Sequence, residues 1–560
     1  MTSVVPPAAK SRDGTPSTIA AVVLFATVLG AAVRVFLPVS APAPLNDGGL
    51  FYAMIRDLQA ARYALPALTS YNVAGIPYAY PPLAFYLTGL VADLLGLEVL
   101  DLVRILPGVF SSLTIPAFYL LAKEVLGSRT RALLPTLVYA FLPRTMDWLV
   151  MGGGITRSPG LLFALLFSRQ IVVLYKSGSW RSGLSAMALG SLVVVTHPEA
   201  ALHAALNGVI FYVLLSRSRK GLLQAAAVTL GTLACSSPWW ATIALRHGWS
   251  VFAAPLSAAA QDSLSLPVRV FSLFGFQFTD EPFLTLLAVL GLIGMAAKIV
   301  RRDLLIPIWL VVTYLAEPRG GGLYLMVPLA MLIASALESV ILPGLSRLAR
   351  KSAGEASTEI AEDGGLEHLL RGSVAKWVLG YVLIYSVMSA FYVILVIQQR
   401  FSLKSGDLAA MDWVRENTPA TTRFALITGE RPLRDSSSEW FPALAERRSA
   451  GTVFGYEWIN DGRFGERTAD YLELQACSNE GPDCLERWQR ATGAVVDCVY
   501  VRRYVEDRSV ERPLESSLRD SREYSVVFDS KMVVILCRQP VLLEPHTTVS
   551  TMTATKMSAR

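Results

Sequence analysis

Long apolar stretches alternate with short polar segments over about the first 400 residues of the chain. The apolar stretches lie near 17–38, 103–123, 132–150, 159–176, 183–197, 199–216, 221–243, 283–299, 304–316, 323–343 and 374–397. Most of them approach the roughly 20 residues that an α-helix needs to cross a bilayer. The pattern predicts a mainly α-helical, polytopic membrane bundle of about eleven spans, which covers residues 17–397.

Composition supports this interpretation. Of the 560 residues, 53% are hydrophobic and 17% are charged, whereas a soluble domain carries about 25% charged residues. A mean hydropathy of +0.45 over this length excludes a disordered chain and an ordinary soluble enzyme. The net charge of +6 comes from short basic clusters between apolar stretches, so we expect membrane lipids and no nucleic acid as partners.

The basic clusters also predict the orientation of the bundle. They lie near 10–12, 123–131, 176–181, 217–220, 298–302 and 347–351. Because Lys and Arg gather in cytoplasmic loops, we expect these loops, the N-terminal segment 1–16 and the linker 346–373 to be cytoplasmic. The apolar segment 80–96 is short, and a span there would move the 123–131 cluster to the outside. It is therefore expected to be a re-entrant or interfacial helix within a large first outer loop, 39–102.

A second domain is predicted at 402–539, where the composition becomes charged and mixed. Strand-like runs occur at 423–428, 451–458, 495–502, 524–528 and 532–537, and helical periodicity at 407–416 and 484–490. This pattern predicts a small α/β domain. An odd number of spans places it on the extracytoplasmic side of the plasma membrane, and the Thr/Ser-rich tail 540–560 is expected to be disordered.

Four of the five cysteines lie in this C-terminal domain, which indicates an oxidising compartment. We expect Cys477 to pair with Cys484 and Cys498 with Cys537, although four cysteines allow three pairings. Cys235 lies within an apolar stretch and is expected to be an inert packing residue.

The first outer loop carries the main candidate for catalysis. Leu50, Met54 and Leu58 recur at helical spacing, so a helix is expected to lie along the membrane surface there. Asp47 precedes it. Free backbone N–H groups at the helix start would keep its carboxylate ionised and able to take up a proton, or Asp47 would only cap the helix.

These features resemble the GT-C type membrane glycosyltransferases, with a pattern similar to the protein O-mannosyltransferase and lipid A aminoarabinose transferase group (glycosyltransferase family 39-like). The shared features are the first-loop acid, the surface helix, the Pro81-Pro82-Leu83 helix start, many spans, and an outer domain containing segments 411–419 and 439–444. The resemblance covers most of the chain.

The resemblance implies transfer of a sugar from a polyprenyl-phosphate carrier to an acceptor hydroxyl at the outer face, with Asp47 as general base. Arg319 is the candidate for holding the donor phosphate, since a guanidinium binds two phosphate oxygens; anchoring at the membrane interface is the alternative. Tyr80 stands where many relatives have Lys, which removes one expected phosphate contact and leaves Arg319 or Arg157 to supply it. Asn46 stands where an acidic neighbour is common, so a divalent metal in this loop lacks support, and we expect no cofactor. The acceptor could be a protein, a lipid or a glycan.

Further polar residues predicted at the outer face are candidates for substrate binding: Glu317, Asp147, Arg157, His197, Glu199 and Tyr80. Asp147 would assist catalysis or, more simply, pair with Arg144 or Arg157. His197 and Glu199, with His203 nearby, would bind the sugar or acceptor, or be structural; their spacing does not indicate a metal site. Tyr80, like Tyr78 and Trp148, would stack on a sugar or belong to the aromatic belt of the interface.

Two other classes of protein fit part of the pattern. A multi-span transporter of a lipid or solute also uses many helices with intramembrane charges, but here the polar groups gather at one face. A scaffold whose outer domain does the binding would not need eleven predicted spans. The sequence therefore favours an enzyme acting at one membrane surface.

Overall fold

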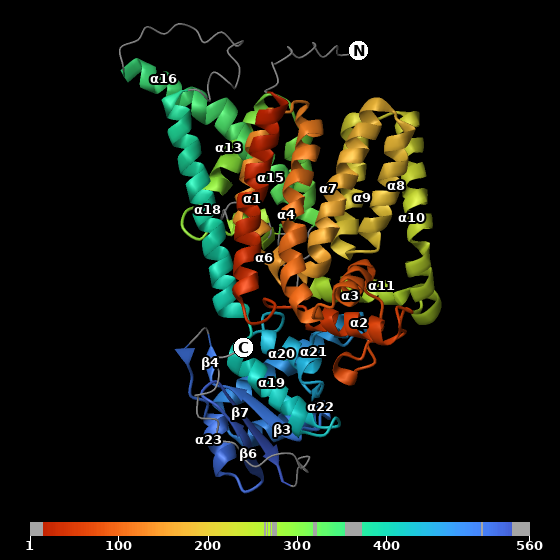
Figure 1. The fold of residues 1–560 in the computed structure, drawn as a ribbon, viewed down its shortest axis with the longest axis vertical. Coiled ribbons are helices and arrows are strands. Elements are labelled where there is room, and N and C mark those ends of the chain that lie inside the picture. The colour runs from red at the N-terminus through yellow and green to blue at the C-terminus, as the bar shows by residue number, and fades with distance from the viewer. Residues whose placement is uncertain are drawn as a thin grey trace.

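The structure, a computed structural model, describes residues 15–261, 277–316, 322–352, 372–505 and 508–539, together with 265, 267, 268, 270 and 271. The described residues form a helical bundle and a C-terminal α/β domain, which lie end to end along the long axis of the molecule (Figure 1). The predictions made for 1–14, for most of the linker and for the tail 540–560 lie outside the described residues.

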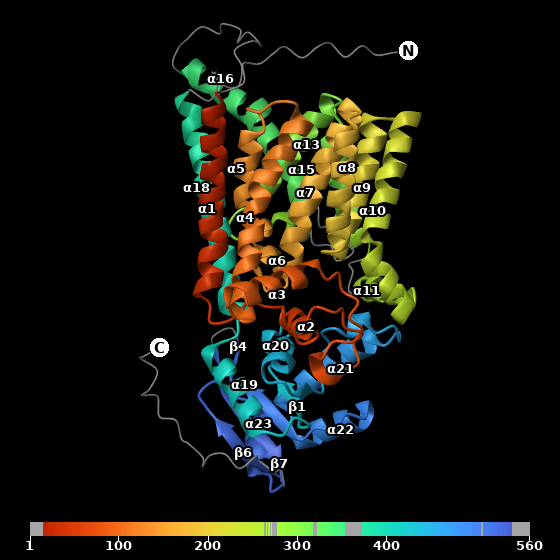
Figure 2. The same cartoon turned by 45° about the vertical axis from the view of Figure 1, so that its right-hand side comes forward.

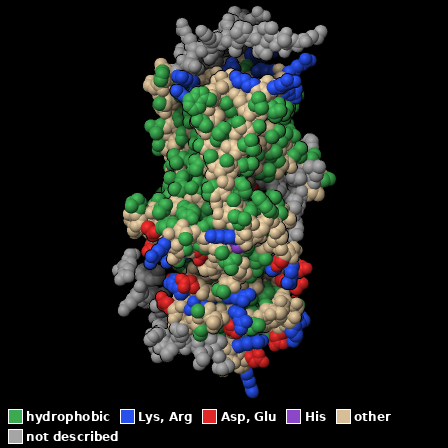
Figure 3. Space-filling view, turned by 90° about the vertical axis from the view of Figure 1, so that its right-hand side faces the viewer, with side chains coloured by type: hydrophobic (Ala, Val, Ile, Leu, Met, Phe, Trp, Pro, Cys, Tyr) green, Lys and Arg blue, Asp and Glu red, His purple; other side chains and the backbone are tan. Residues whose placement is uncertain are grey.

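Six of the described helices are long and apolar enough to cross a membrane. They are α1 (Pro16–Ser40), α4 (Val99–Leu126), α7 (Gly154–Ser177), α9 (Pro198–Leu215), α18 (Ser373–Phe401) and the continuous run Met326–Ala349, which joins α15 (Met326–Ala336), the π-helix η4 (Leu337–Ile341) and part of α16 (Leu342–Ser352). Apolar side chains cover the bundle, and Lys and Arg gather at the edge farthest from the C-terminal domain (Figure 3). The chain is a membrane protein.

Other helices complete the bundle. They are α5 (Leu133–Phe141), α8 (Trp180–Val194), α10 (Arg219–His247), α13 (Leu286–Val300) and α14 (Leu305–Ala316). Helix α11 (Ser250–Gln261) follows α10 at the end of the bundle that faces the C-terminal domain (Figure 2). Each of the eleven predicted stretches contains a helix. Among the described residues only six helices are both long and apolar enough to cross a membrane, so length and hydropathy support six spans rather than eleven.

Two predicted boundaries are wrong. The stretch 132–150 is not one helix: α5 ends at Phe141, and the chain continues through the 3₁₀ turn η2 (Pro143–Thr145) and the short helix α6 (Asp147–Val150). Pro143 explains the break, because a residue before proline avoids the α conformation, and Leu142 is extended with ψ 123°. The linker predicted from 346 begins later, since α16 continues to Ser352.

The first loop contains α2 (Gly49–Ala60), the 3₁₀ turn η1 (Tyr71–Val73) and α3 (Leu83–Leu95). Helices α2 and α3 lie at the end of the bundle that faces the C-terminal domain (Figure 2). Helix α3 has 13 residues, too few to cross a bilayer. The loop therefore forms a layer between bundle and domain.

The C-terminal domain contains a five-stranded sheet in the order β2-β1-β3-β7-β6, with β1 parallel to β2 and β3, and β7 antiparallel to β3 and β6. Its strands are β1 (Arg423–Ile427), β2 (Arg448–Ser449), β3 (Cys498–Arg502), β6 (Tyr524–Asp529) and β7 (Val533–Arg538); β4 (Tyr504–Val505) and β5 (Arg508–Ser509) form a separate hairpin. Its helices are α19 (Ser405–Asn417), α20 (Ser436–Leu444), α21 (Phe464–Ala476), α22 (Pro482–Thr492) and α23 (Pro513–Asp520).

The strand predicted at 451–458 is wrong. This segment is a loop that ends in the 3₁₀ turn η5 (Tyr456–Trp458), and Gly455 takes φ 86°. A left-handed residue interrupts a strand, and here it lets Trp458 turn toward the first loop. The other four strand-like runs each contain a strand of the sheet.

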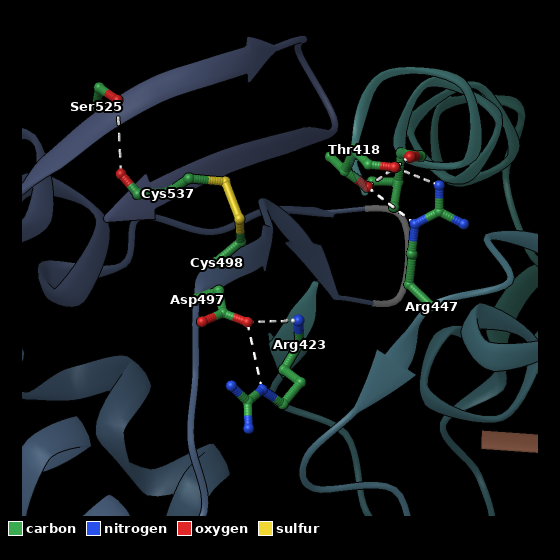
Figure 4. The surroundings of a disulfide bond; sticks show 8 residues. Thr418, Arg423, Arg447, Asp497, Cys498, Ser525 and Cys537 are labelled. Atoms are coloured by element: carbon green, nitrogen blue, oxygen red, sulfur yellow. Dashed lines mark hydrogen bonds and ion pairs between the residues drawn. A yellow bond between two sulfur atoms is a disulfide. The ribbon is translucent and has the colours of Figure 1, made fainter. Parts of the chain in front are cut away.

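Two disulfides stabilise the domain, and they have the pairing that the sequence favoured. Cys477 is bonded to Cys484 and Cys498 to Cys537. The second disulfide joins β3 to β7 (Figure 4). Next to it, the Asp497 carboxylate accepts the backbone N–H of Arg423 at 2.8 Å. Cys235 is a free, exposed cysteine in α10.

Hydrogen bonds join the first loop to the end of α18 and to the C-terminal domain. The Asn46 N–H donates to the Phe401 carbonyl at 2.8 Å, and Leu45 and Ser402 form an isolated antiparallel bridge. The Asn72 side chain donates to the Ser449 carbonyl at 3.0 Å and accepts the Ser449 N–H at 2.7 Å. These contacts link residues that are more than 350 positions apart, so the loop and the domain form one structural unit.

Candidate functional site

The loop between α1 and α2 places Asp47 between the bundle and the C-terminal domain. Asp47 does not cap α2, because the N-cap residue is Gly48, with φ 121° and no side chain. Only glycine adopts this conformation at little cost. A Cβ on Gly48 would also lie 2.9 Å from the backbone of Gly152. The helix-capping hypothesis for Asp47 is therefore wrong, and its carboxylate is available for other contacts.

The Asp47 carboxylate is held from the bundle side. The Gly153 N–H donates to Oδ1 at 2.9 Å, and the Arg157 guanidinium donates to Oδ2 at 2.7 Å. Asp47 is 7% exposed. Glycine is required beside it, because a Cβ on Gly152 would lie 1.9 Å from the Asp47 carbonyl oxygen and a Cβ on Gly153 would lie 2.4 Å from Oδ2. The glycines at 152 and 153 thus permit the close approach of the two loops.

Arg157, in the first turns of α7, is held in place by two contacts. It pairs with Asp47, and its guanidinium lies 5.0 Å from the centre of the Trp148 ring. Its Nη1 atom is buried and has no hydrogen-bond partner among the described residues. A charged donor without a partner is costly when buried, so this atom is suited to an oxygen of a bound substrate.

Tyr80 closes the site on another side. Its hydroxyl lies 3.1 Å from the Thr156 hydroxyl, and the side chain packs among aromatic rings, with centroids 4.6 Å from Phe51 and 5.4 Å from Trp458. Burial raises the pKa of Tyr80 above its usual range; the Arg157 charge lowers it, while the Glu199 and Asp47 charges raise it. Tyr80 is therefore neutral at physiological pH and packed against Trp458 of the C-terminal domain.

His197 and Glu199 start α9 beside this cluster. His197 is the N-cap residue of α9, and its Nδ1 accepts the Ala200 N–H at 3.3 Å. Its ring centroid lies 6.3 Å from that of Tyr80. His203 stacks on Tyr324 at 4.1 Å. His197 therefore caps α9, and Glu199 is half-buried in the first turn of the same helix. Substrate binding by His197 and Glu199 stays a prediction.

Asp147 lies beside a cavity of about 360 Å³ that also reaches the Asp47 loop. Its lining residues are Asn46, Arg144, Asp147, Trp148, Met151, Asp280, Pro282, Tyr392, Val393, Val396, Ile397, Phe401 and Arg434. One wall is the apolar face of α18, and the other carries charged side chains. The cavity therefore has the amphipathic character that suits a lipid with a charged head group.

The expectation that Asp147 pairs with Arg144 or Arg157 is wrong for the described residues. Arg144 pairs with Asp280 at 2.6 Å, and Arg157 pairs with Asp47. Burial, and then the Asp280 charge, raise the pKa of Asp147 to about 6. The pKa of Asp147 therefore lies above the usual range of an aspartate.

The structure brings together Asp47, Arg157, Tyr80, His197 and Glu199, and places Asp147 at the adjacent cavity. Arg319 and Glu317 lie outside the described residues, so the phosphate contact predicted for Arg319 stays a prediction. Among the described residues, no group of three or more His, Cys, Asp or Glu side chains could hold a metal ion.

Residue-by-residue reasoning missed the contribution of the C-terminal domain. Glu439 and Trp440 contact the Asp47 loop directly, and Arg434 lines the cavity. The segment 439–444 carried a resemblance to other outer domains, but nothing local in it shows which part of the bundle it would meet. Only the tertiary structure relates it to a loop almost 400 residues earlier.

This fold, with a helical membrane bundle, a first loop with helices at one end and a C-terminal domain over that loop, is similar to the fold of solved GT-C glycosyltransferases. No protein-family model matches the chain, and no curated protein matches its sequence. The fold is therefore established by comparison with solved structures.

Among the solved structures with a fold similar to that of this chain are three glycosyltransferases. Aminoarabinose transferase ArnT from Cupriavidus metallidurans, bound to undecaprenyl phosphate, superposes with a TM-score of 0.56 at 14% identity, covering 95% of this chain and 99% of that one. Oligosaccharyltransferase AglB from Archaeoglobus fulgidus, in complex with an inhibitory peptide and a dolichol-phosphate, gives 0.52 at 12% identity, with 87% and 69% covered. Arabinofuranosyltransferase AftD from Mycobacteria gives 0.53 at 15% identity, with 94% and 40% covered.

Proposed function

We propose that this protein is a membrane glycosyltransferase that moves a sugar from a polyprenyl-phosphate donor to an acceptor hydroxyl at the extracytoplasmic face of the plasma membrane. The observation that supports this most strongly is the Asp47 carboxylate, held between Gly153 and Arg157 in the first loop of a GT-C fold. The solved structures with bound polyprenyl phosphates support the donor class.

In this proposal Asp47 acts as the general base. The acceptor oxygen attacks the anomeric carbon, the bond between that carbon and the phosphate oxygen breaks, and the carrier phosphate leaves with the electron pair. Asp47 takes up the acceptor proton and later releases it to water. Oδ1 accepts a hydrogen bond from the Gly153 N–H and Oδ2 one from Arg157, which leaves lone pairs for the acceptor hydroxyl.

The amphipathic cavity would bind the donor. The apolar side chains of α18 suit an isoprenoid chain, while Arg144 and Arg434 provide positive charge for the phosphate. Arg319, predicted from the sequence, would contribute to the same phosphate. Arg157, with its unpartnered Nη1, would stabilise negative charge that develops at the reacting centre.

The Lys and Arg rim at the far edge of the bundle supports the orientation (Figure 3). Because basic residues favour the cytoplasmic side, the C-terminal domain would face outward. Disulfides in that domain agree with an oxidising compartment.

The test measures release of carrier phosphate from short-chain polyprenyl-phosphate sugars by the full-length protein in lipid nanodiscs. We expect Asp47→Asn to lower the rate by about 100-fold or more, the usual loss on removing a general base. Asp101→Asn, which removes an exposed carboxylate paired with Arg104, is the matched control and should leave the rate unchanged.

Two results would contradict the proposal. Equal rates for Asp47→Asn and the wild type would remove the catalytic role of Asp47. Flux of a lipid or solute through proteoliposomes, without sugar transfer, would support the transporter alternative instead.

A further inference from the structure

Glu439, in α20 of the C-terminal domain, reaches the loop that carries Asp47. Its Oε1 accepts the Gly48 N–H at 2.7 Å. The next residue, Trp440, donates from its indole N–H to the Asn46 carbonyl at 2.9 Å. Both backbone neighbours of Asp47 are therefore held by consecutive side chains of α20, and Figure 2 shows α20 directly beside α2.

The contact is close as well as polar. A Cβ on Gly49 would lie 2.6 Å from the Glu439 carbonyl oxygen, and a Cβ on Gly48 would lie 3.2 Å from the Trp440 ring. The Tyr71 hydroxyl donates to the same Glu439 carbonyl at 2.6 Å. Helix α20 thus packs closely against the backbone of the Asp47 loop, and this close packing requires glycine at positions 48 and 49.

The other carboxyl oxygen of Glu439 is the unusual feature. Glu439 is 4% exposed, and its Oε2 has no hydrogen-bond partner within the described part of the chain. A buried ionised carboxylate with one free oxygen is strongly disfavoured, whereas the protonated acid is tolerated and still accepts the Gly48 N–H.

We propose that Glu439, acting as a neutral acid, is a positioning residue that holds the 46–49 loop so that the Asp47 carboxylate faces its substrate. This inference rests on the proposed function of Asp47 and extends the active site to the C-terminal domain. It assigns the domain a direct part in the geometry of the base.

The charged groups around Glu439 support the neutral state. Burial raises the pKa of Glu439 most strongly, and the charges of Asp47, in the loop before α2, and of Glu457, in η5, raise it further. The hydrogen bond from the Gly48 N–H and the charge of Arg157 in α7 lower it. The balance keeps the pKa of Glu439 well above its usual range. Ionisation of Glu439 at alkaline pH would place a second negative charge beside Asp47 and weaken the packing of α20 against the 46–49 loop.

Two substitutions separate these effects. Glu439→Gln keeps the shape and the acceptor oxygen for Gly48 but cannot ionise, so we expect near wild-type kcat at neutral pH and activity that persists to higher pH. Glu439→Ala removes the bond to Gly48, and we expect kcat to fall by about 10-fold, the value of one hydrogen bond, with an unchanged KM for the donor. Glu446→Gln, an exposed carboxylate just after α20, is the matched control.

A stability measurement tests the inference without any activity. A raised pKa in the folded state means that stability is lost as pH rises from the usual Glu range toward the raised value. We therefore expect the wild-type Tm to fall over that range more than the Tm of Glu439→Gln does, with Glu446→Gln behaving like the wild type.

The outcomes distinguish the two proposals. If Asp47→Asn retains transfer but Glu439→Gln removes the pH-dependent loss of Tm, the catalytic role of Asp47 fails and the neutral Glu439 stands. If Glu439→Gln loses activity as fully as Glu439→Ala at neutral pH, or if the pH profiles of stability are the same, the positioning role of neutral Glu439 is refuted.

Discussion

Replacing Gly153 by alanine tests the geometry of Asp47 with one methyl group. The backbone at Gly153 is already α-helical, with φ −65°, so alanine adds no backbone strain. Its Cβ would lie 2.4 Å from the Asp47 Oδ2 and 2.6 Å from the Arg157 Nη1. Because ordinary contacts begin at 3.4 Å, the carboxylate must move by about 1 Å, and a displacement of that size costs about 100-fold in rate.

The assay compares release of carrier phosphate with thermal unfolding for the same preparations. Gly190→Ala is the matched control, because its Cβ would lie 2.5 Å from the Thr232 hydroxyl in the packing of α8 against α10, away from Asp47. Both variants should lose about 1–3 kcal/mol of stability from overpacking, but only Gly153→Ala should lose activity about 100-fold. A folded Gly153→Ala protein with activity close to that of the wild type would refute the reasoning.

Two further predictions concern stability. The pKa of Asp147 is raised to about 6, so its ionisation destabilises the folded state as pH rises from the usual Asp range; Asp147→Asn should therefore raise Tm by a few degrees at neutral pH and by less near about pH 4.5. A constant difference in Tm at all pH values would contradict this. Replacing Cys498 and Cys537 by alanine opens a 39-residue separation and should cost the C-terminal domain about 4 kcal/mol, against about 2 kcal/mol for Cys477 and Cys484, which are 7 apart. Denaturant unfolding measures the free energy of unfolding that each pair of substitutions removes. Equal losses for the two disulfides would contradict the expected dependence on loop length.

Local patterns in the sequence were sufficient to predict most of the helices and strands. Apolar length located the helices, and alternating runs located four strands of the sheet. The stretch 132–150 was misjudged because its apolar character continues past Pro143, and hydropathy does not register the break that proline imposes. The run 451–458 was misjudged because its apolar residues pack against the first loop through a turn rather than along a strand.

The candidate site was predictable only in part. Asp47 and Arg157 were identified as polar residues at one end of the bundle, but their ion pair depends on the glycines that let two loops approach, which no spacing rule connects. His197 was predicted either to bind substrate or to be structural, and the cap that its Nδ1 provides for α9 could not be read from the sequence pattern. Glu439 was beyond the reach of local reasoning, because its partners in the loop lie 391 residues earlier.

The docking of α20 on the 46–49 loop has a consequence for biosynthesis. A ribosome completes the loop long before it reaches Glu439 and Trp440, which follow their partners by 391 and 394 residues. During that interval the nascent bundle lacks the two hydrogen bonds that fix the neighbours of Asp47. Catalytic competence would therefore appear only in the last stage of maturation, once the final domain has folded onto the earliest loop, and an unfinished chain would be inserted but inactive.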